Sequence, residues 1–192
     1  MSATTTSTTT ATIVPTGTWA IDPAHSKVGF AVKHMGIATV RGEFTQFEGT
    51  LEVGEDLGSL RARGTVQAES VDTNESQRDA HLRSPDFFDA EHNPQITFQS
   101  TSIEPLDEES LRITGNLTMH GVTNELVLGA RLQGAELDPW GNERVGLEVT
   151  GQLSRGDYGM KFNQALGSGN MLVSDKVTLT LDVSAVRQAS RA

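Results

Sequence analysis

From residue 18 onward, apolar and polar side chains alternate along short segments that Gly, Asn, Asp and Pro separate from one another. In one of them, Val28, Phe30 and Val32 each stand between small or charged neighbours. This period of two residues is typical of antiparallel strands that bury one face. The pattern predicts an all-β fold with at least eight strands, in residues 18–21, 27–33, 40–53, 60–69, 95–103, 111–119, 125–133, 144–153 and 176–186.

One segment breaks this period and predicts a short helix over about residues 75–83. Asn74 is placed to cap the helix, and Pro85 follows its end. Asp79 and Arg83 lie four residues apart with the acid first, a pairing that modestly favours a helix.

A sandwich and a barrel share this periodicity, but the length of the strands favours the barrel. Several segments have about ten residues and would span about 33 Å at roughly 3.3 Å per residue. Tilted by about 40°, such strands build a wall about 25 Å tall. An eight-stranded barrel encloses either packed side chains or one small ligand.

The length of 192 residues fits one domain. Residues 1–12 contain only Met, Ser, Ala and Thr, so we expect a disordered tail over residues 1–16 and a single domain over residues 17–188. Neither a basic start nor an apolar run of about 7–15 residues precedes Pro15, which predicts a cytoplasmic protein. No run approaches the roughly 18 apolar residues of a transmembrane helix.

Charge and cysteine content exclude several classes of protein. With 15 Lys+Arg against 25 Asp+Glu, the formal net charge is −10. Nucleic-acid binding would lack its usual electrostatic attraction, and an anionic membrane surface is disfavoured for the same reason. Without cysteine the chain has no disulfide, no thiolate nucleophile and no Cys-ligated metal.

The five histidines are the first place to look for catalysis or metal binding, and no known catalytic spacing surrounds them. Two alternatives stay open. His25 and Ser26 follow Asp22 and could form a hydrolase site, although turn chemistry explains them more simply. His81 and His92 stand in a segment dense in carboxylates and could bind a divalent metal, although a solvated helix and loop is the favoured interpretation.

Phenylalanine and methionine allow two interpretations of the barrel interior. They could fill an ordinary core, which would leave an interaction module with a packed barrel, or line a lumen that accepts an apolar chain. The stretch 158–170 lacks alternation and carries three glycines, which predicts a mobile loop at the rim.

Several short motifs, in order, resemble the YceI family of lipocalin-like, polyisoprenoid-binding proteins. The resemblance spans about residues 18–186 and rests on Ile21-Asp22-Pro23-Ala24-His25-Ser26, Val28-Gly29-Phe30-Ala31-Val32-Lys33-His34-Met35, Val40-Arg41-Gly42-Glu43-Phe44, Ser70-Val71-Asp72-Thr73-Asn74, Arg78-Asp79-Ala80-His81-Leu82, Asp86-Phe87-Phe88-Asp89-Ala90, Pro94-Gln95-Ile96-Thr97-Phe98, the strand over residues 115–121 with Val122-Thr123, and Tyr158-Gly159-Met160.

This resemblance implies an eight-stranded antiparallel barrel of extended lipocalin type with a short helix covering one end. It implies a non-enzymatic protein, often a homodimer, that holds a long polyisoprenoid such as an isoprenoid quinone for storage, transport or stress protection. No catalytic residue, metal ligand or cofactor carries over. Many members have a secretion signal, whereas none is recognised in this sequence.

Strand parity and the rim loops give the residues expected to contact such a ligand. The inward-facing candidates are Val28, Phe30, Val32, Phe44, Val66, Ile96, Phe98, Leu117, Met119, Leu147 and Val149, and the rim candidates are Phe87, Phe88, Met160 and Phe162. A single bulge would exchange the two faces of a strand.

Overall fold

The computed structural model describes residues 14–55 and 59–189, so the tail predicted over residues 1–12 lies outside the described residues. Val14 is only 1% exposed. The indole Nε1 of Trp19 donates a hydrogen bond of 2.9 Å to the carbonyl oxygen of Pro15. The packed domain therefore begins before the boundary expected at Gly17.

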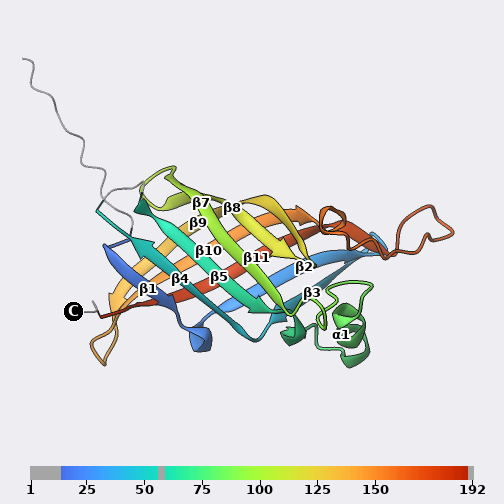
Figure 1. The fold of residues 1–192 in the computed structure, drawn as a ribbon, viewed down its shortest axis with the longest axis horizontal. Coiled ribbons are helices and arrows are strands. Elements are labelled where there is room, and N and C mark those ends of the chain that lie inside the picture. The colour runs from blue at the N-terminus through green and yellow to red at the C-terminus, as the bar shows by residue number, and fades with distance from the viewer. Residues whose placement is uncertain (1–13, 56–58, 190–192) are drawn as a thin grey trace, which may run out of the picture.

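Antiparallel strands close into a barrel because β1 pairs with both β4 and β11 (Figure 1). The ring runs β1–β4–β5–β7–β8–β9–β10–β11 and has eight positions, which confirms the predicted fold. Strands β2, β3 and β6 continue the positions of β1, β4 and β5 toward one end. The strands are β1 Gly17–Ile21, β2 Lys27–His34, β3 Ala38–Phe44, β4 Phe47–Val53, β5 Arg61–Gln67, β6 Val71–Asp72, β7 Gln95–Pro105, β8 Ser110–Met119, β9 Val122–Leu137, β10 Glu143–Ser154 and β11 Val173–Arg187.

Three positions of the ring each hold two strands: β1 with β2, β4 with β3, and β5 with β6. The breaks between such strands shift which residues face the interior. Trp19 in β1 and Val28 in β2 both point inward although they lie nine positions apart, because the 3-10 turn η1 (Pro23–His25) shifts the alternation by one. Phe44 in β3 and Leu51 in β4 are related in the same way. The segment predicted as a single strand over 40–53 is therefore divided into β3 and β4, whereas the strand predicted over 60–69 is β5 and ends at the 3-10 turn η3 (Ala68–Ser70).

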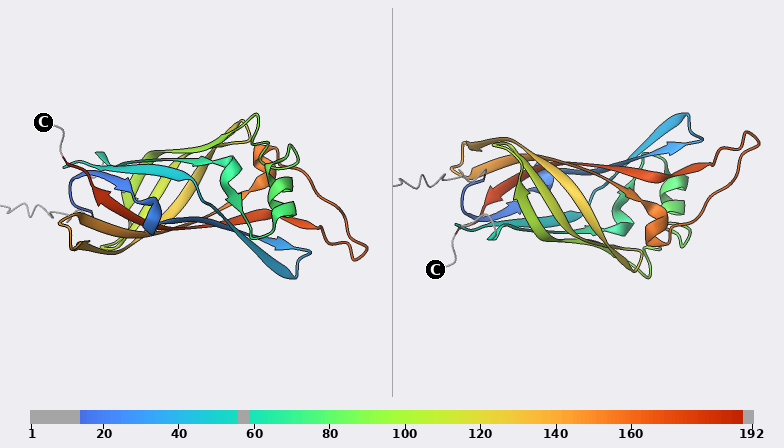
Figure 2. Two further views of the ribbon diagram at one scale, coloured as in Figure 1. Left: turned by 90° about the horizontal axis from the view of Figure 1, so that it is seen from below. Right: turned by 90° about the horizontal axis from the view of Figure 1, so that it is seen from above.

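Helix α1 (Ser76–Arg83) covers one end of the barrel, beside β6 (Figure 2). The helix confirms the prediction, but its cap differs. Glu75 is the N-cap residue, and its carboxylate accepts hydrogen bonds from the backbone N–H groups of Gln77 and Arg78. Asn74 instead adopts a left-handed backbone, with φ of 62°, in the turn before the helix. No helix of the described residues is both long and apolar enough to cross a membrane.

The pairing predicted between Asp79 and Arg83 is wrong, because both side chains have tertiary partners. Asp79 is buried and accepts hydrogen bonds from Thr73. Arg83 donates to the carbonyl oxygens of Glu69 and Val71, at 2.7 and 3.0 Å. Both contacts tie the helix to the barrel rather than stabilise it locally.

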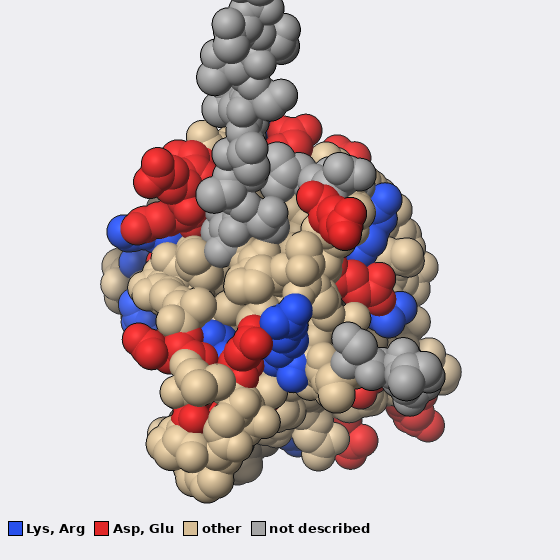
Figure 3. Space-filling view, turned by 90° about the vertical axis from the view of Figure 1, so that its left-hand side faces the viewer, with Lys and Arg blue, Asp and Glu red and all other residues tan. Residues whose placement is uncertain are grey.

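The end opposite α1 is filled by side chains. Trp19, Leu60, Leu111 and Val145 are all at most 4% exposed there, and none of them lines the cavity described below. Figure 3 views this end, where acidic side chains are spread around the surface. The barrel is therefore closed on the side of the chain termini.

Two segments project beyond α1 at the other end, namely the β2–β3 turn and residues 164–172 (Figure 2). The backbone N–H of Met35 donates to the carbonyl oxygen of Leu172 at 2.9 Å, which places the two segments side by side at this point.

Residues 164–172 form a small hairpin, in which Ala165 and Met171 make a β-bridge. The backbone N–H of Leu172 donates to the carbonyl oxygen of Gln164 at 2.8 Å. Tyr158, the first residue of the predicted loop, is 2% exposed in the 3-10 turn η4 (Arg155–Tyr158). Backbone pairing therefore orders much of the stretch that lacked alternation.

Candidate ligand-binding site

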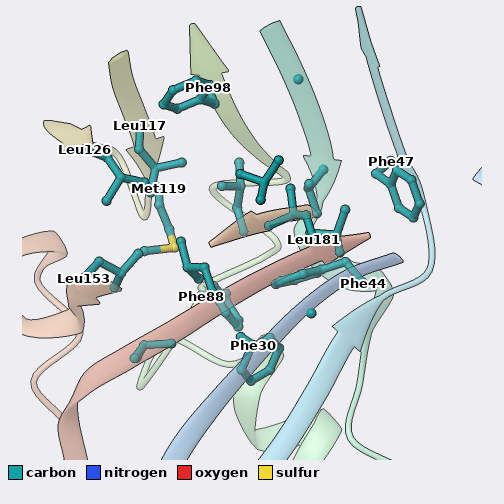
Figure 4. Close-up of a pocket in the computed structure, with 18 of the residues that line it drawn as sticks. Phe30, Phe44, Phe47, Phe88, Phe98, Leu117, Met119, Leu126, Leu153 and Leu181 are labelled. Carbon is teal, nitrogen blue, oxygen red and sulfur yellow. The ribbon is translucent and has the colours of Figure 1, made fainter. Parts of the chain in front are cut away.

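A cavity of about 480 Å³ lies inside the barrel between α1 and the filled end. Its wall is almost entirely apolar, and its size falls within the range of roughly 300–1,000 Å³ that is usual for ligand pockets. Figure 4 shows Leu117 and Met119 of β8 facing Phe30, Phe44 and Phe88 across it. The barrel is therefore not packed solid, and the interaction-module alternative loses its structural basis.

All the residues expected from parity and from the rim loops line this cavity: Val28, Phe30, Val32, Phe44, Val66, Phe87, Phe88, Ile96, Phe98, Leu117, Met119, Leu147, Val149, Met160 and Phe162. Their contact with a ligand stays a prediction. Inward-facing residues of one strand share a parity, and the shifts between successive strands leave that parity unchanged within each strand.

Sequence reasoning missed much of the wall on β9 and β11. Leu126 and Leu128 of β9 line the cavity, as do Leu179, Leu181 and Val183 of β11. The alternation in both strands carried the signal, because these residues share one parity within each strand. Only the closure of the barrel decides which of the two faces points inward.

The polar residues of the wall gather mostly at the α1 end. Those at this end are Lys33, His34, Thr73, Arg78, His81 and Arg155. The others, Glu48, Thr50, Arg63 and Thr65, alternate on β4 and β5 with the inward-facing residues, and Arg63 bonds Thr50 and Glu52 on the outer face. An elongated ligand with one polar end would therefore find hydrogen-bonding groups beside α1 and an apolar surface beyond it.

Arg155 is the charged side chain buried most deeply in this wall, at 5% exposure. Its guanidinium donates to the carbonyl oxygens of Ser174, Met160 and Val173, at 2.9, 2.7 and 3.3 Å. It also lies 5.9 Å from the ring centroid of Phe87. Burial lowers the pKa of Arg155. The side chain clamps η4 to the start of β11 at the rim of the cavity.

A second network holds α1 on the barrel. The backbone N–H and the hydroxyl of Thr73 both donate to the Oδ1 atom of Asp79, at 2.8 and 2.5 Å. Arg78 then donates through Nε to the hydroxyl of Thr73 at 2.7 Å, and through Nη2 to its carbonyl oxygen at 2.9 Å. Because Thr73 and Arg78 also line the cavity, the network that seats the helix shapes the cavity rim.

His81 belongs to an aromatic cluster over the same rim. Its ring centroid lies 5.0 Å from that of Phe87 and 4.8 Å from that of Phe162, both edge to face. Its Nε2 atom is 2.8 Å from a carboxylate oxygen of Asp86. The position of His81 is therefore explained by packing and by one hydrogen bond.

The metal alternative gains no support from these contacts. His92 pairs with Asp89 at 2.9 Å, and this hydrogen bond raises the pKa of His92. His81 pairs with a different aspartate. Within the described part of the chain, no group of three or more His, Asp or Glu side chains could hold a metal ion.

The hydrogen bonds of Ser26 argue against the hydrolase alternative. Its hydroxyl donates to the carbonyl oxygen of Ser184 at 3.2 Å and accepts from the backbone N–H of the same residue at 2.9 Å. A serine nucleophile needs its hydroxyl bonded to a general base. His25 instead pairs with Asp22, at 2.8 Å, on the surface.

Comparison with known proteins agrees with this architecture. The family model described as YceI-like domain matches residues 19–185. A UPF0312 protein of Pseudomonas paraeruginosa is 39% identical over 165 residues, which cover 85% of this chain and 83% of the relative. The chain belongs to the YceI-like domain family.

Two solved structures show how widely this YceI-like barrel recurs. The YceI protein of Campylobacter jejuni superposes with a TM-score of 0.70 at 30% identity, over 88% of this chain and 96% of that one. A polyisoprenoid binding domain from Saccharophagus degradans shares the fold, with a TM-score of 0.65 at 15% identity, over 88% of this chain and 98% of that one. The YceI-like chain is thus a barrel with an internal ligand-binding cavity.

The motifs that carried the family resemblance are largely structural in this YceI-like chain. Asp22 and Ser26 fix the break between β1 and β2 through hydrogen bonds to the Ala24 backbone and to Ser184. Thr73 and Asp79 seat the helix. These residues set the shape of the cavity without supplying a reactive group.

Proposed function

We propose that the chain is a non-enzymatic carrier or store for a long-chain polyisoprenoid, such as an isoprenoid quinone or a related prenyl lipid. The observation that carries the proposal is the apolar cavity inside the barrel, with polar residues concentrated at its α1 end. The description of the Saccharophagus degradans domain as polyisoprenoid binding supports this ligand class.

The apolar wall favours a long chain over a small ligand. Each buried CH₂ contributes ~0.8 kcal/mol, so about twelve of them contribute about 10 kcal/mol. Association costs roughly 4–15 kcal/mol. A ligand held mainly by this wall needs many apolar carbons, and the flexible side chain of Met119 can adapt to their shape.

The polar residues favour one orientation of the ligand. The head group would lie near Thr73, Arg78 and Arg155, and the chain would extend toward the filled end below Trp19. Thr73 and Arg78 already hydrogen-bond each other, so the head group would join an existing network.

Denaturing extraction of freshly purified full-length protein, followed by mass spectrometry, tests the proposal. We expect a prenyl lipid at up to one molecule per chain, and stoichiometric binding of an added isoprenoid quinone in detergent-free buffer. If the purified protein contains no prenyl lipid and binds none that is added, the proposal is wrong.

A matched pair of variants locates the ligand in the cavity. Leu181→Trp places a large ring in the lumen, since Leu181 lines the cavity on β11, and should lower prenyl-lipid binding at least tenfold. Thr180→Trp adds the same ring on the exposed outer face of that strand and should bind normally. Equal binding by both variants would place the ligand outside the lumen.

A further inference from the structure

The two projecting segments form one exposed surface, which we call the tip surface. It comprises the β2–β3 turn and the hairpin 164–172, which the hydrogen bond from Met35 to Leu172 joins. Three large apolar side chains are exposed on it: Met35 at 37%, Ile37 at 80% and Met171 at 46%. Exposed apolar residues grouped in this way mark an interaction site more often than scattered ones do.

Three cations flank the tip surface, although the chain as a whole is acidic. Neither residues 28–42 nor residues 158–174 contain Asp or Glu, whereas Lys33, Arg41 and Lys161 lie within them. None of these three cations forms an ion pair with another described residue. The tip surface itself carries no charged side chain; these three cations flank it, and the next acids along the chain are Glu43, Asp157 and Asp175.

Many of the acids lie at the opposite end. The turns there, residues 104–112 and 134–144, carry Glu104, Asp107, Glu108, Glu109, Glu136, Asp138 and Glu143 against only Arg112 and Arg144. Trp140 is 82% exposed at this end, but it stands among these acids. Acids such as Glu75, Asp86, Asp157 and Asp175 also lie at the α1 end, but none lies within the two projecting segments, so a negative surface would attract these segments rather than the filled end.

The tip surface is continuous with the mouth of the cavity. Lys33 and His34 at the base of the β2–β3 turn line the cavity, and so do Leu172 and Val173 at the base of the hairpin. Whatever the tip surface touches therefore lies next to the α1 end of the lumen.

We propose that the tip surface docks on an anionic lipid bilayer. Met35, Ile37 and Met171 would enter the interface, while Lys33, Arg41 and Lys161 would contact lipid phosphates. The expectation from net charge alone, that anionic membranes repel this protein, overlooks the uneven distribution of charge. The consequence for function rests on the proposed prenyl-lipid cargo, because docking would place the cavity mouth where such a lipid enters or leaves.

Flotation of the full-length protein with vesicles tests the proposal. We expect binding to vesicles of phosphatidylglycerol and phosphatidylcholine to be at least tenfold stronger than binding to pure phosphatidylcholine, and to weaken in high salt. Lys161→Gln with Arg41→Gln should reduce binding to the anionic vesicles several-fold. Equal binding to both vesicle types, or binding to neither, would overturn the proposal.

Two further variants test whether vesicle binding depends on the tip surface or on exposed apolar side chains in general. Ile37→Ser should lower vesicle binding at least tenfold, whereas Trp140→Ser, which removes an even more exposed side chain from the acidic end, should leave it unchanged. Both should keep the wild-type melting temperature. Equal losses in the two variants would contradict docking through the tip.

The same experiments distinguish other outcomes. If Ile37→Ser converts a dimer to a monomer in sedimentation velocity and wild-type protein ignores anionic vesicles, the tip surface binds a second copy and the proposal is wrong. Vesicle binding is measured without prenyl lipid, whereas cargo is measured by extraction. The docking proposal can therefore be supported when the cargo proposal is wrong, and the cargo proposal can be supported when docking is wrong.

Discussion

The Nη1 atom of Arg144 lies 2.8 Å from the Oδ2 atom of Asp22, a residue 122 positions earlier in the chain. The contact joins the start of β10 to the break between β1 and β2. Asp22 also accepts the backbone N–H of Ala24, at 3.0 Å, and so caps the turn η1. One carboxylate therefore fixes both the local break and its place on the barrel.

Stability should fall at acid pH through Asp22. Hydrogen bonds from Arg144 and then His25 lower the pKa of Asp22 to about 2, from an ordinary value of about 3.9. A carboxyl group with a depressed folded-state pKa stabilises the fold above its unfolded pKa, and this contribution is lost between about pH 4 and pH 2. Asp22→Asn should lower the melting temperature at pH 7 and flatten its dependence on pH in that window.

Asp138 shares Arg144 with Asp22, because the Nε atom of Arg144 donates to the Oδ2 atom of Asp138 at 2.9 Å. Desolvation raises the pKa of Asp138, but hydrogen bonds from Asn142 and Arg144 outweigh it and leave the pKa well below its usual range. Melting curves of Asp22→Asn, Asp138→Asn and the double variant separate the two contributions. A difference between wild type and Asp22→Asn that is as large at pH 2 as at pH 7 would show that the pairing contributes nothing.

Asp79→Ala should destabilise the protein by about 2–3 kcal/mol, because it leaves the buried N–H and hydroxyl of Thr73 without their acceptor. Urea denaturation measures this change. Gln77→Ala, on an exposed position of the same helix, should stay within about 0.5 kcal/mol of wild type. Equal effects would mean that the contact to Thr73 does not hold the helix in place.

Alanine substitutions of two glycines in the neighbouring strands β8 and β9 should change the stability of the protein by different amounts. A Cβ on Gly115 would lie 2.5 Å from both the carbonyl oxygen of Gln99 and the ring of Phe98, so Gly115→Ala should cost about 1–3 kcal/mol. A Cβ on Gly129 would meet nothing closer than 3.6 Å, and Gly129→Ala should be neutral or slightly stabilising. Thermal melts of both variants compare them, and a neutral Gly115→Ala would contradict the close packing at β8.

Replacing a leucine by alanine should lower the free energy of unfolding more at the filled end than in the lumen. Leu111 is 4% exposed and outside the cavity wall, so Leu111→Ala should create a new void and cost about 3 kcal/mol. Leu181 already faces a cavity, so Leu181→Ala in lipid-free protein should cost less than about half of that. Chemical denaturation of the two variants tests the difference, and equal costs would indicate that the lumen collapses in solution.

The sequence predicted the strands well because alternation within one strand is a local property. Val28, Phe30 and Val32 share a face for any strand that contains them, and all three line the cavity. The helix over residues 76–83 was predicted for a similar reason, since its start and its end have local signals. The length of the strands already favoured a barrel, and the family resemblance added the class of ligand.

The tertiary structure alone decided how one strand relates to the next and to α1. The turn η1 shifts the inward face between Trp19 and Val28, and the partners of Asp79 and Arg83 come from the barrel wall rather than from the helix. The tip surface also required the fold, because the fold brings Met35 beside Leu172, 137 residues later. Alternation and caps depend on neighbours along the chain, whereas the cavity, its rim and the tip surface depend on contacts that only the folded barrel creates.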